Sequence, residues 1–424
     1  MSRSSQRSTI KDMTNGSPAK LILGFAVPML MGLLFQQFYS MVDTIIVGKF
    51  LGVDALASVG STSAINFMIN GFVIGVCTGF SIPVAQRFGA QDYKDMRRFV
   101  ANAGWIASCF AVVMTVIVCL MTRQILVWMQ IPDDIAEEAN AYMFVVLLGT
   151  GATVFYNMIS NMLRALGDSK TPLYFLVFSS VLNIILDIVF IVPMHMGVAG
   201  AAWGTALSLA VSALLLFLSL CDKRREIHLL LNKEYIRPDK DILKKMVFLG
   251  VPTAMEQFIT TSGQVISTRI VSTLGTVAVA ANTLAVSAES LSYMPAYGVS
   301  VATTTLVSQS IGAEKKDDAM KFGKIANRLG FCAMIFVGIL LFVFAEPLIR
   351  LFTRDESVIP LAAAMLRIVA IAQPLNASCS ILSGALRGAA DVKSPFFIGI
   401  FGMWGLRVPL ALLFVFVFHW GLHG

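Results

Sequence analysis

The chain has 424 residues, of which 57% are hydrophobic and only 13% charged, and its mean hydropathy is +0.77. Soluble domains carry roughly 25% charged residues, so this composition excludes an ordinary soluble domain and indicates a membrane protein. A net charge of +7 is also compatible with nucleic-acid binding, but basic residues of membrane proteins usually mark cytoplasmic loops. We therefore expect a lipid environment and no nucleic-acid partner.

Apolar runs of about 20 residues or more recur along the chain, each long enough to cross a hydrocarbon core of roughly 30 Å as a helix. Period-two alternation is absent from them, which favours helices over barrel strands. Six spans are predicted first, near residues 20–48, 56–83, 98–121, 136–163, 172–193 and 198–220. Five more follow, near residues 245–272, 279–309, 325–345, 358–386 and 395–418.

The sequence contains an internal duplication. The motif Arg164-Ala-Leu-Gly-Asp-Ser-Lys-Thr-Pro172 returns 223 residues later as Arg387-Gly-Ala-Ala-Asp-Val-Lys-Ser-Pro395. Other pairs follow the same offset, to within one residue: Gln86 and Gln309, Gly52 and Gly275, Pro28 and Pro252. A period this long indicates a duplicated domain, since solenoid repeats run to roughly 20–50 residues. Six spans per copy is an even number, so the copies should be parallel repeats about an axis along the membrane normal.

The repeated motif is interpreted as structural. Gly167 suits a tight turn, Pro172 suits the first turn of the next helix, and Arg164 with Asp168 would tie two helix ends together. A phosphate-binding loop is disfavoured because the spacing G-x-x-x-x-G-K-[ST] is missing.

These patterns predict an all-α polytopic membrane protein of two six-helix lobes. The expected parts are a cytoplasmic tail (1–19), a first lobe with six spans (20–220), a connector (221–244) and a second lobe with five spans (245–424). Gly197-Val-Ala-Gly200 matches Gly421-Leu-His-Gly424, and in the first copy a further apolar run follows. We therefore expect that a twelfth helix is missing from this chain; the alternative is a natural eleven-span protein.

Basic residues predict the orientation. With the N-terminus in the cytoplasm, 25 of the 32 Lys and Arg residues fall in cytoplasmic segments, and the stretch from Cys221 to Lys245 alone carries eight. The positive-inside rule is then satisfied. We expect a multi-pass protein of the cell (inner) membrane with a cytoplasmic N-terminus.

Several segments together resemble the MATE (multidrug and toxic compound extrusion) family. They are the stretch from Asp43 to Ala57, the loops Gln86–Ala90 and Gln309–Ala313, and both copies of the Arg…Asp-x-Lys-Ser/Thr-Pro motif. The resemblance covers essentially the whole chain. It implies two six-helix lobes, a central cleft, and export of amphiphilic, often cationic small molecules in exchange for H⁺ or Na⁺, with no other cofactor. We expect a monomer. The departure from the family is the twelfth helix.

The first lobe offers a candidate cation site. Asp187 lies deep in the fifth span with Asn183 four residues earlier on the same helix face. Carboxylate and amide oxygens are hard ligands that suit a small cation. The resemblance adds Asp43 and Thr205, so that these four residues would bind H⁺ or Na⁺; no other metal site is expected. The alternatives are that Asp43 pairs with Lys49 near the interface and that Asn183 only joins helices.

The second lobe carries Glu256 in the seventh span and Glu289 in the eighth. Glu256 matches an acid used by the other branch of the family, but the tenth span has no Asp to partner it. Glu256 therefore either neutralises an Arg or receives a cationic substrate. Tyr39, Tyr293 and Tyr297 are candidates for substrate contact, since their hydroxyl groups need partners in an apolar setting and their rings attract cations.

The function expected from these features is cation-coupled antiport of drugs and toxic compounds. The alternative is a flippase for a lipid-linked or oligosaccharide precursor. An intramembrane enzyme is disfavoured because no H-E-x-x-H or G-x-S-x-G pattern occurs and the four His residues fall in loops or at span ends. We expect no enzymatic activity.

Overall fold

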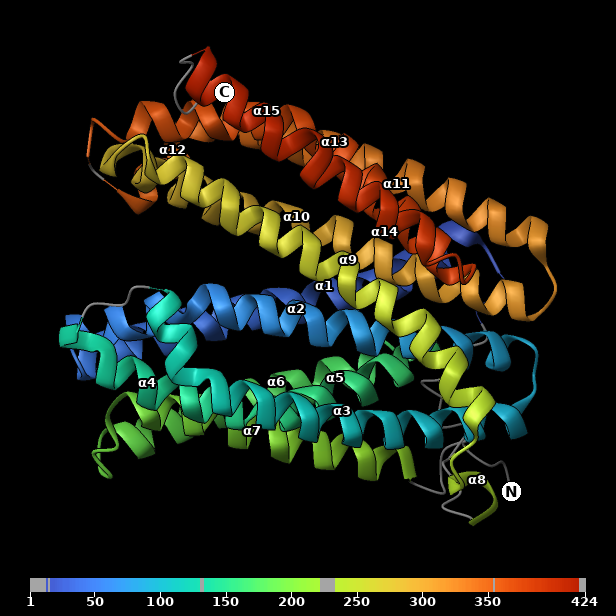
Figure 1. Ribbon diagram of the computed structural model, residues 1–424. Coiled ribbons are helices and arrows are strands. Elements are labelled where there is room, and N and C mark those ends of the chain that lie inside the picture. The colour runs from blue at the N-terminus through green and yellow to red at the C-terminus, as the bar shows by residue number, and fades with distance from the viewer. Residues whose placement is uncertain (1–12, 14–15, 130–132, 222–232, 354, 419–424) are drawn as a thin grey trace, which may run out of the picture. The chain divides into compact units, whose positions relative to one another are not determined.

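The computed structural model describes residues 13, 16–129, 133–221, 233–353 and 355–418. Throughout these residues the regular structure is helical, and they include no strand (Figure 1). The predicted all-α fold is confirmed. Most of the predicted tail 1–19, much of the connector 221–244 and the stretch from Gly421 to Gly424 lie outside the described residues.

Every predicted span coincides with one helix or with consecutive helices. The first copy consists of α1 (Pro18–Phe50), α2 (Val53–Gly89), α3 (Tyr93–Trp128), α4 (Asp133–Leu148), α5 (Thr150–Ala165), α6 (Lys170–Ile191) and α7 (Gly197–Cys221). The short α8 (Lys233–Ile236) precedes the second copy, which begins with α9 (Lys240–Ser272), α10 (Thr276–Gly312), α11 (Lys316–Val343), α12 (Ala345–Phe352) and α13 (Ile359–Gly388). The last span combines α14 (Lys393–Ile400), η1 (Phe401–Arg407), α15 (Val408–Leu412) and η2 (Leu413–Val417), in which π-helical turns alternate with α-helical ones.

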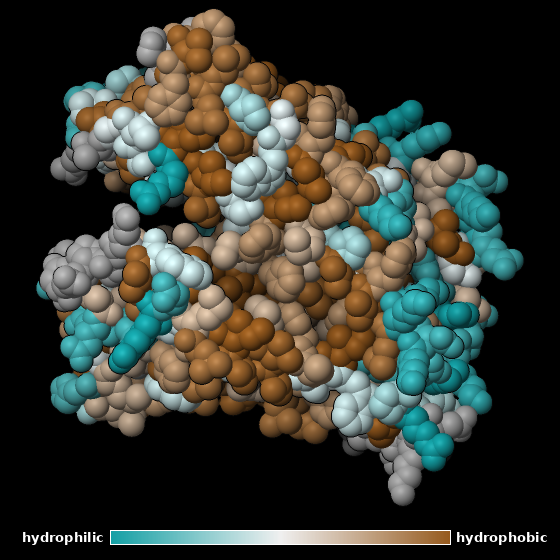
Figure 2. All heavy atoms as spheres, viewed as in Figure 1, coloured by the Kyte–Doolittle hydropathy of each residue, from teal (hydrophilic) through white to brown (hydrophobic). Residues whose placement is uncertain are grey.

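Among the described residues, nine helical segments are long and apolar enough to cross a membrane. Helices α9 and α10 match two further predicted spans in length but are more polar, because α9 carries several charged residues and α10 many Ser and Thr residues. Large apolar side chains on the spans are exposed, such as Leu120 at 81% and Ile371 at 71%. In Figure 2 hydrophobic side chains cover the sides of the helices and hydrophilic ones gather toward helix ends. The surface therefore suits lipid.

The duplication extends to single backbone angles. Positive φ occurs at three pairs of positions related by the offset of 223 residues: Gly52 (92°) and Gly275 (99°), Gln91 (58°) and Glu314 (60°), Gly167 (80°) and Ala390 (65°). In the last pair an alanine adopts in the second copy the left-handed conformation that a glycine adopts in the first. The two copies thus share the same turn conformations even where their residues differ, as at Gln91 and Glu314 or Gly167 and Ala390.

The repeated motif starts a helix in both copies. Asp168 accepts hydrogen bonds from the Thr171 N–H (2.9 Å) and from the Thr171 hydroxyl (2.6 Å) at the start of α6. Asp391 accepts the equivalent bonds from the Ser394 N–H (3.1 Å) and hydroxyl (2.6 Å) at the start of α14. The Ser394 hydrogen bonds lower the pKa of Asp391. The aspartate of each motif therefore satisfies backbone donors that a helix start leaves unpaired.

The described residues form two compact units. Unit 1 contains Met31–Ala254, and unit 2 contains Thr14–Leu30 with Met255–Gly424, as far as these ranges are described. Helices α1 and α9 therefore each belong to both units, and each changes unit two residues after an internal proline, Pro28 or Pro252. A proline removes a helical hydrogen bond and bends the helix. The predicted division at the connector would have kept both helices whole.

In each unit, one half of α1 or α9 comes from the other copy of the repeat, and we call it the exchanged half-helix. Glycines allow this half-helix to pack closely against the second helix of the unit, α2 in unit 1 and α10 in unit 2. In unit 1 a Cβ added to Gly75 of α2 would lie 2.7 Å from the Ala254 Cα of α9. At Gly79, one turn on, it would lie 2.5 Å from the Gly250 Cα. In unit 2 a Cβ on Gly298, the counterpart of Gly75, would lie 3.3 Å from the Ala26 carbonyl oxygen of α1. The same position of the repeat thus receives the half-helix in both units.

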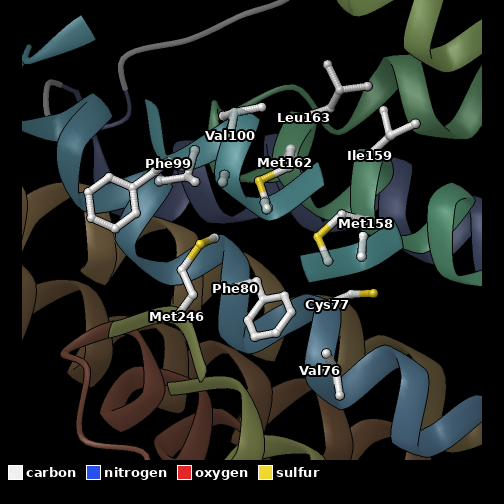
Figure 3. Packing of buried hydrophobic residues seen from close by; sticks show 14 of the residues in the cluster. Val76, Cys77, Phe80, Phe99, Val100, Met158, Ile159, Met162, Leu163 and Met246 are labelled. Atoms are coloured by element: carbon white, nitrogen blue, oxygen red, sulfur yellow. The ribbon is translucent and has the colours of Figure 1, made fainter. Parts of the chain in front are cut away.

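The core of unit 1 joins side chains from α2, α3, α5, α7 and the first half of α9, most of which Figure 3 shows. Phe80, Phe99, Met162 and Met246 are among its buried residues. In unit 2 hydroxyl groups connect α10 to α13: Ser300, Thr304 and Ser308 donate to the carbonyl oxygens of Ser380 (2.6 Å), Gly384 (2.9 Å) and Gly388 (3.0 Å). Such interhelical hydrogen bonds replace the hydrophobic effect, which lipid does not supply between helices.

The Gly167 and Ala390 pair generates a reciprocal prediction. Ala390→Gly should stabilise the protein by about 0.5–1 kcal/mol, because it removes the strain of an alanine at positive φ, and Gly167→Ala should destabilise it by about 1 kcal/mol. Thermal unfolding of the detergent-solubilised protein measures both changes. Ala389→Gly is the matched control, since φ there is −76° and glycine offers no relief. A lower midpoint for Ala390→Gly, like that of the control, would contradict the argument.

Candidate functional site

The first candidate site is built on α6 and α7 of unit 1. Asn183 and Asp187 lie one helical turn apart on α6 and are 2% and 0% exposed. The Asn183 amide donates one hydrogen bond to Asp187 Oδ1 (3.2 Å) and the other to the Thr205 hydroxyl of α7 (3.2 Å). The structure therefore brings these three predicted residues into one hydrogen-bonded group.

Asp43 reaches the same group from α1. Its carboxyl group is close enough to the Asp187 carboxyl group for the two to interact electrostatically. Two carboxyl groups in such proximity favour the binding of a cation or a proton between them. The ion pairs found among the described residues include none between Asp43 and Lys49. The geometry thus differs from the alternative in which Asp43 pairs with Lys49.

Three oxygen atoms of this group are buried and have no hydrogen-bond partner among the described residues. They are Asp43 Oδ1, Asn183 Oδ1 and Asp187 Oδ2. A buried acceptor without a donor destabilises a structure by about 1–3 kcal/mol. Carboxylate and amide oxygens that lack donors are suitable ligands for a small cation or a proton.

Sequence reasoning missed two residues beside this site. Tyr142 of α4 lies within electrostatic range of both Asp43 and Asp187, as does the predicted Tyr39 of α1. Gly204 of α7 is in direct contact with Asp187, since a Cβ at this position would overlap Asp187 Oδ1. The signals were a tyrosine in a predicted span and the small-x-x-x-small pattern formed by Gly200 and Gly204.

The second candidate site, in unit 2, has a different charge balance. Glu256 of α9 forms an ion pair with Arg387 of α13 at 3.4 Å, and the two side chains are 12% and 16% exposed. Arg387 belongs to the repeated motif and lies in the last turn of α13. Of the two expectations for Glu256, this geometry corresponds to neutralisation by an arginine.

The other residues predicted for the second lobe lie on α10. Glu289 accepts a long hydrogen bond from the Gln373 amide (3.4 Å) and lies within electrostatic range of Arg407. The Tyr293 hydroxyl contacts the Ser380 hydroxyl at 3.4 Å, and the Tyr293 and Tyr297 rings are 6.2 Å apart. Glu256 and Glu289 thus each have a guanidinium group nearby.

Within the described part of the chain, no group of three or more His, Cys, Asp or Glu side chains is arranged to hold a metal ion. The oxygen set of unit 1 combines two carboxyl groups with an amide and a hydroxyl, which suits Na⁺ or H⁺ better than a transition metal.

A duplicated bundle of apolar helices with ionisable side chains buried inside it is the arrangement of a secondary transporter. The model of the MatE family matches this sequence twice, at residues 28–189 and 252–413, and so covers both copies of the repeat. The chain belongs to this family of membrane transporters.

Related proteins extend the match over nearly the whole chain. The probable multidrug resistance protein NorM of Thermotoga maritima is 31% identical, over 96% of this chain and 87% of its own length. The probable multidrug resistance protein YoeA of Bacillus subtilis is 29% identical, over 92% of this chain and 85% of its own. Among solved structures, a MOP superfamily transporter from Pyrococcus furiosus aligns with a TM-score of 0.90 at 25% identity, covering 100% of this chain and 93% of that one.

The Glu256 and Arg387 pair generates a stability prediction. Arg387→Gln should destabilise the protein by about 3 kcal/mol, because it leaves a largely buried carboxylate without its cation. The double variant Glu256→Gln/Arg387→Gln should recover most of that loss. Thermal unfolding in detergent measures both variants.

The control for this prediction is Arg350→Gln, which breaks the exposed ion pairs of Arg350 with Glu346 and Glu356. Exposed pairs contribute little, so the control should leave the midpoint unchanged. An effect of Arg387→Gln as small as that of the control would show that the pair with Glu256 does not hold α9 to α13.

Proposed function

We propose that the chain is a multidrug efflux antiporter that exports amphiphilic, often cationic small molecules in exchange for H⁺ or Na⁺. Membership of the MatE family and the names of its relatives support multidrug efflux. The geometry of unit 1 supports the ion exchange. Transport, and not catalysis, is the activity to test.

One observation carries the proposal: the three buried oxygens of Asp43, Asn183 and Asp187 that have no donor among the described residues. At about 1–3 kcal/mol each, they hold several kcal/mol that a bound ion would recover. Reversing a two-state population from 1:99 to 99:1 takes about 5.5 kcal/mol of differential binding. The two magnitudes are comparable, as the proposed coupling by a single ion requires.

Either ion fits the chemistry of the site. A proton would bridge the carboxyl groups of Asp43 and Asp187, and Na⁺ would bind the three oxygens without donors together with the Thr205 hydroxyl. Whichever ion binds must prefer the state from which drug has been released, because a ligand with equal affinity for both states shifts nothing. Ion entry and drug exit would then be coupled by mutual exclusion.

Unit 2 contributes to substrate contact rather than to ion coupling in this proposal. Arg387 already neutralises Glu256, so an ion at Glu256 would have to displace a tethered guanidinium group. The neighbouring Tyr293 and Tyr297 rings, tilted by 41° to each other, offer aromatic surfaces to flat amphiphilic molecules. The partially exposed Tyr293 side chain is accessible for such contact.

Asp187→Asn tests the coupling. The variant keeps the shape of the side chain and removes its charge, so drug binding to the detergent-solubilised protein should survive while ion-driven efflux disappears. Ethidium efflux from vesicles under an imposed pH or Na⁺ gradient measures the second property and identifies the ion. Efflux at the wild-type rate and expression level would exclude Asp187 as the coupling residue and leave Glu256 as the leading candidate.

Two controls accompany this experiment. Asp168→Asn changes an aspartate that starts α6 outside the site, so it should lower the yield of protein and leave coupling intact. Asp43→Asn should behave like Asp187→Asn, and Lys49→Gln should have no effect on coupling. A coupling defect in Lys49→Gln would instead favour a pair between Asp43 and Lys49.

We propose that the protein lies in the inner membrane of the cell. Its N-terminus and its basic loops then face the cytoplasm. Asp317→Cys, at the start of α11, should then react with a membrane-impermeant maleimide only from the cytoplasmic side, and Glu356→Cys, before α13, only from the outside. The six native cysteines are replaced first. Labelling of both positions from one side would contradict the proposed orientation, since one span separates them.

A further inference from the structure

Helix α7 turns a row of small residues toward the inside of unit 1. Gly200, Gly204, Ser208 and Ser212 follow one another at intervals of four residues, and all four are buried. A Cβ on Gly200 would lie 3.1 Å from the Phe190 Cβ of α6, and the Ser212 hydroxyl donates to the Phe175 carbonyl oxygen of α6 (3.5 Å). Small residues at this spacing allow two membrane helices to approach closely.

Gly204 is the member of this row that lies against Asp187. An added Cβ would overlap Asp187 Oδ1 and would lie 3.1 Å from the Asp187 Cγ and 3.2 Å from its backbone nitrogen. The carboxyl group is therefore in contact with the α7 backbone, and no side chain separates the two. Alanine at this position would force either the carboxyl group or the helix to move.

The oxygen that Gly204 contacts is the one that accepts the Asn183 hydrogen bond. The next residue along α7, Thr205, receives the second hydrogen bond of the same amide. Two adjacent residues of α7 thus fix this group: one supplies space for Asp187 and the other an acceptor for Asn183. With both amide donors used, Asn183 Oδ1 and Asp187 Oδ2 are left buried without a donor among the described residues.

We infer that Gly204 is a positioning residue for the coupling ion: its missing side chain holds Asp187 Oδ1 against α7 and Asn183, so that the remaining oxygens are available as ion ligands. This inference rests on the proposed function. A side chain at residue 204 would rotate the Asp187 carboxyl group or separate α6 from α7, and either change breaks the hydrogen bond to Asn183. Loss of such supporting contacts typically lowers the affinity of an ion site about 10- to 100-fold.

The test measures ion binding directly, on the purified full chain. The midpoint of thermal unfolding is followed as Na⁺ replaces choline at constant ionic strength, and separately as the H⁺ concentration rises, because an ion that binds the folded state stabilises it by mass action. For Gly204→Ala the ion concentration that gives half of the stabilisation should rise about 10- to 100-fold relative to wild type.

The matched control is Gly200→Ala, which crowds the same pair of helices one turn away without touching Asp187. It should lower the midpoint in the absence of the ion and keep the wild-type half-saturating concentration. Suppose that Asp187→Asn abolishes the ion response but Gly204→Ala leaves the half-saturating ion concentration unchanged. That result would overturn the inference about Gly204 and leave the proposed function intact. A wild-type chain without any ion response would overturn the proposed function and the inference with it.

A second variant covers the case in which Gly204→Ala does not fold. Gly204→Ala/Asp187→Ala removes the carboxyl group that the new Cβ would meet, so the yield of folded protein should recover relative to Gly204→Ala. If shortening Asp187 does not restore the yield, the crowding lies elsewhere and the inference is wrong.

Discussion

Helices inside a bilayer cannot rely on the hydrophobic effect to hold them together, because lipid tails are as apolar as leucine. Contact must come from close packing and from hydrogen bonds between helices. In this chain glycine provides the first, at Gly75 and Gly79 against α9, and hydroxyl groups provide the second, from α10 to the carbonyl oxygens of α13. The candidate ion site depends on the same constraint, since Gly204 allows α7 to reach Asp187.

Much of the fold could be predicted from the sequence, because the relevant signals are local or repeated. Apolar runs gave the spans, and the repeated motif gave helix starts that Asp168 and Asp391 occupy in the structure. The exchange of half-helices could not be predicted. A repeat shows which residues are equivalent, but not which copy a segment packs against. Both copies contain a proline at the point of exchange and a glycine at the receiving position, so either arrangement satisfies the same pattern.

Contacts of the candidate site within one helix could be predicted from sequence spacing. Contacts between different helices could not. Asn183 and Asp187 are four residues apart on one helix, so their contact follows from helical geometry. Asp43 and Thr205 came only from the family resemblance, and Tyr142 and Gly204 were missed, because nothing in the sequence relates their helices to α6. An arginine partner was one of the two expectations for Glu256, but Arg387 could not be identified as that partner for the same reason: 131 residues separate the two.

The exchange of half-helices also bears on how such a chain arose. The glycine face of the second helix in each unit is covered by a half-helix from the other copy of the repeat, through Ala254 in unit 1 and through Ala26 in unit 2. A single copy made as a separate polypeptide would leave that face uncovered. Two such polypeptides would complete each other by swapping their first half-helices, as in domain-swapped homodimers. Fusion of two such genes would keep the same contacts between helices. After fusion, the two copies could acquire different charged residues.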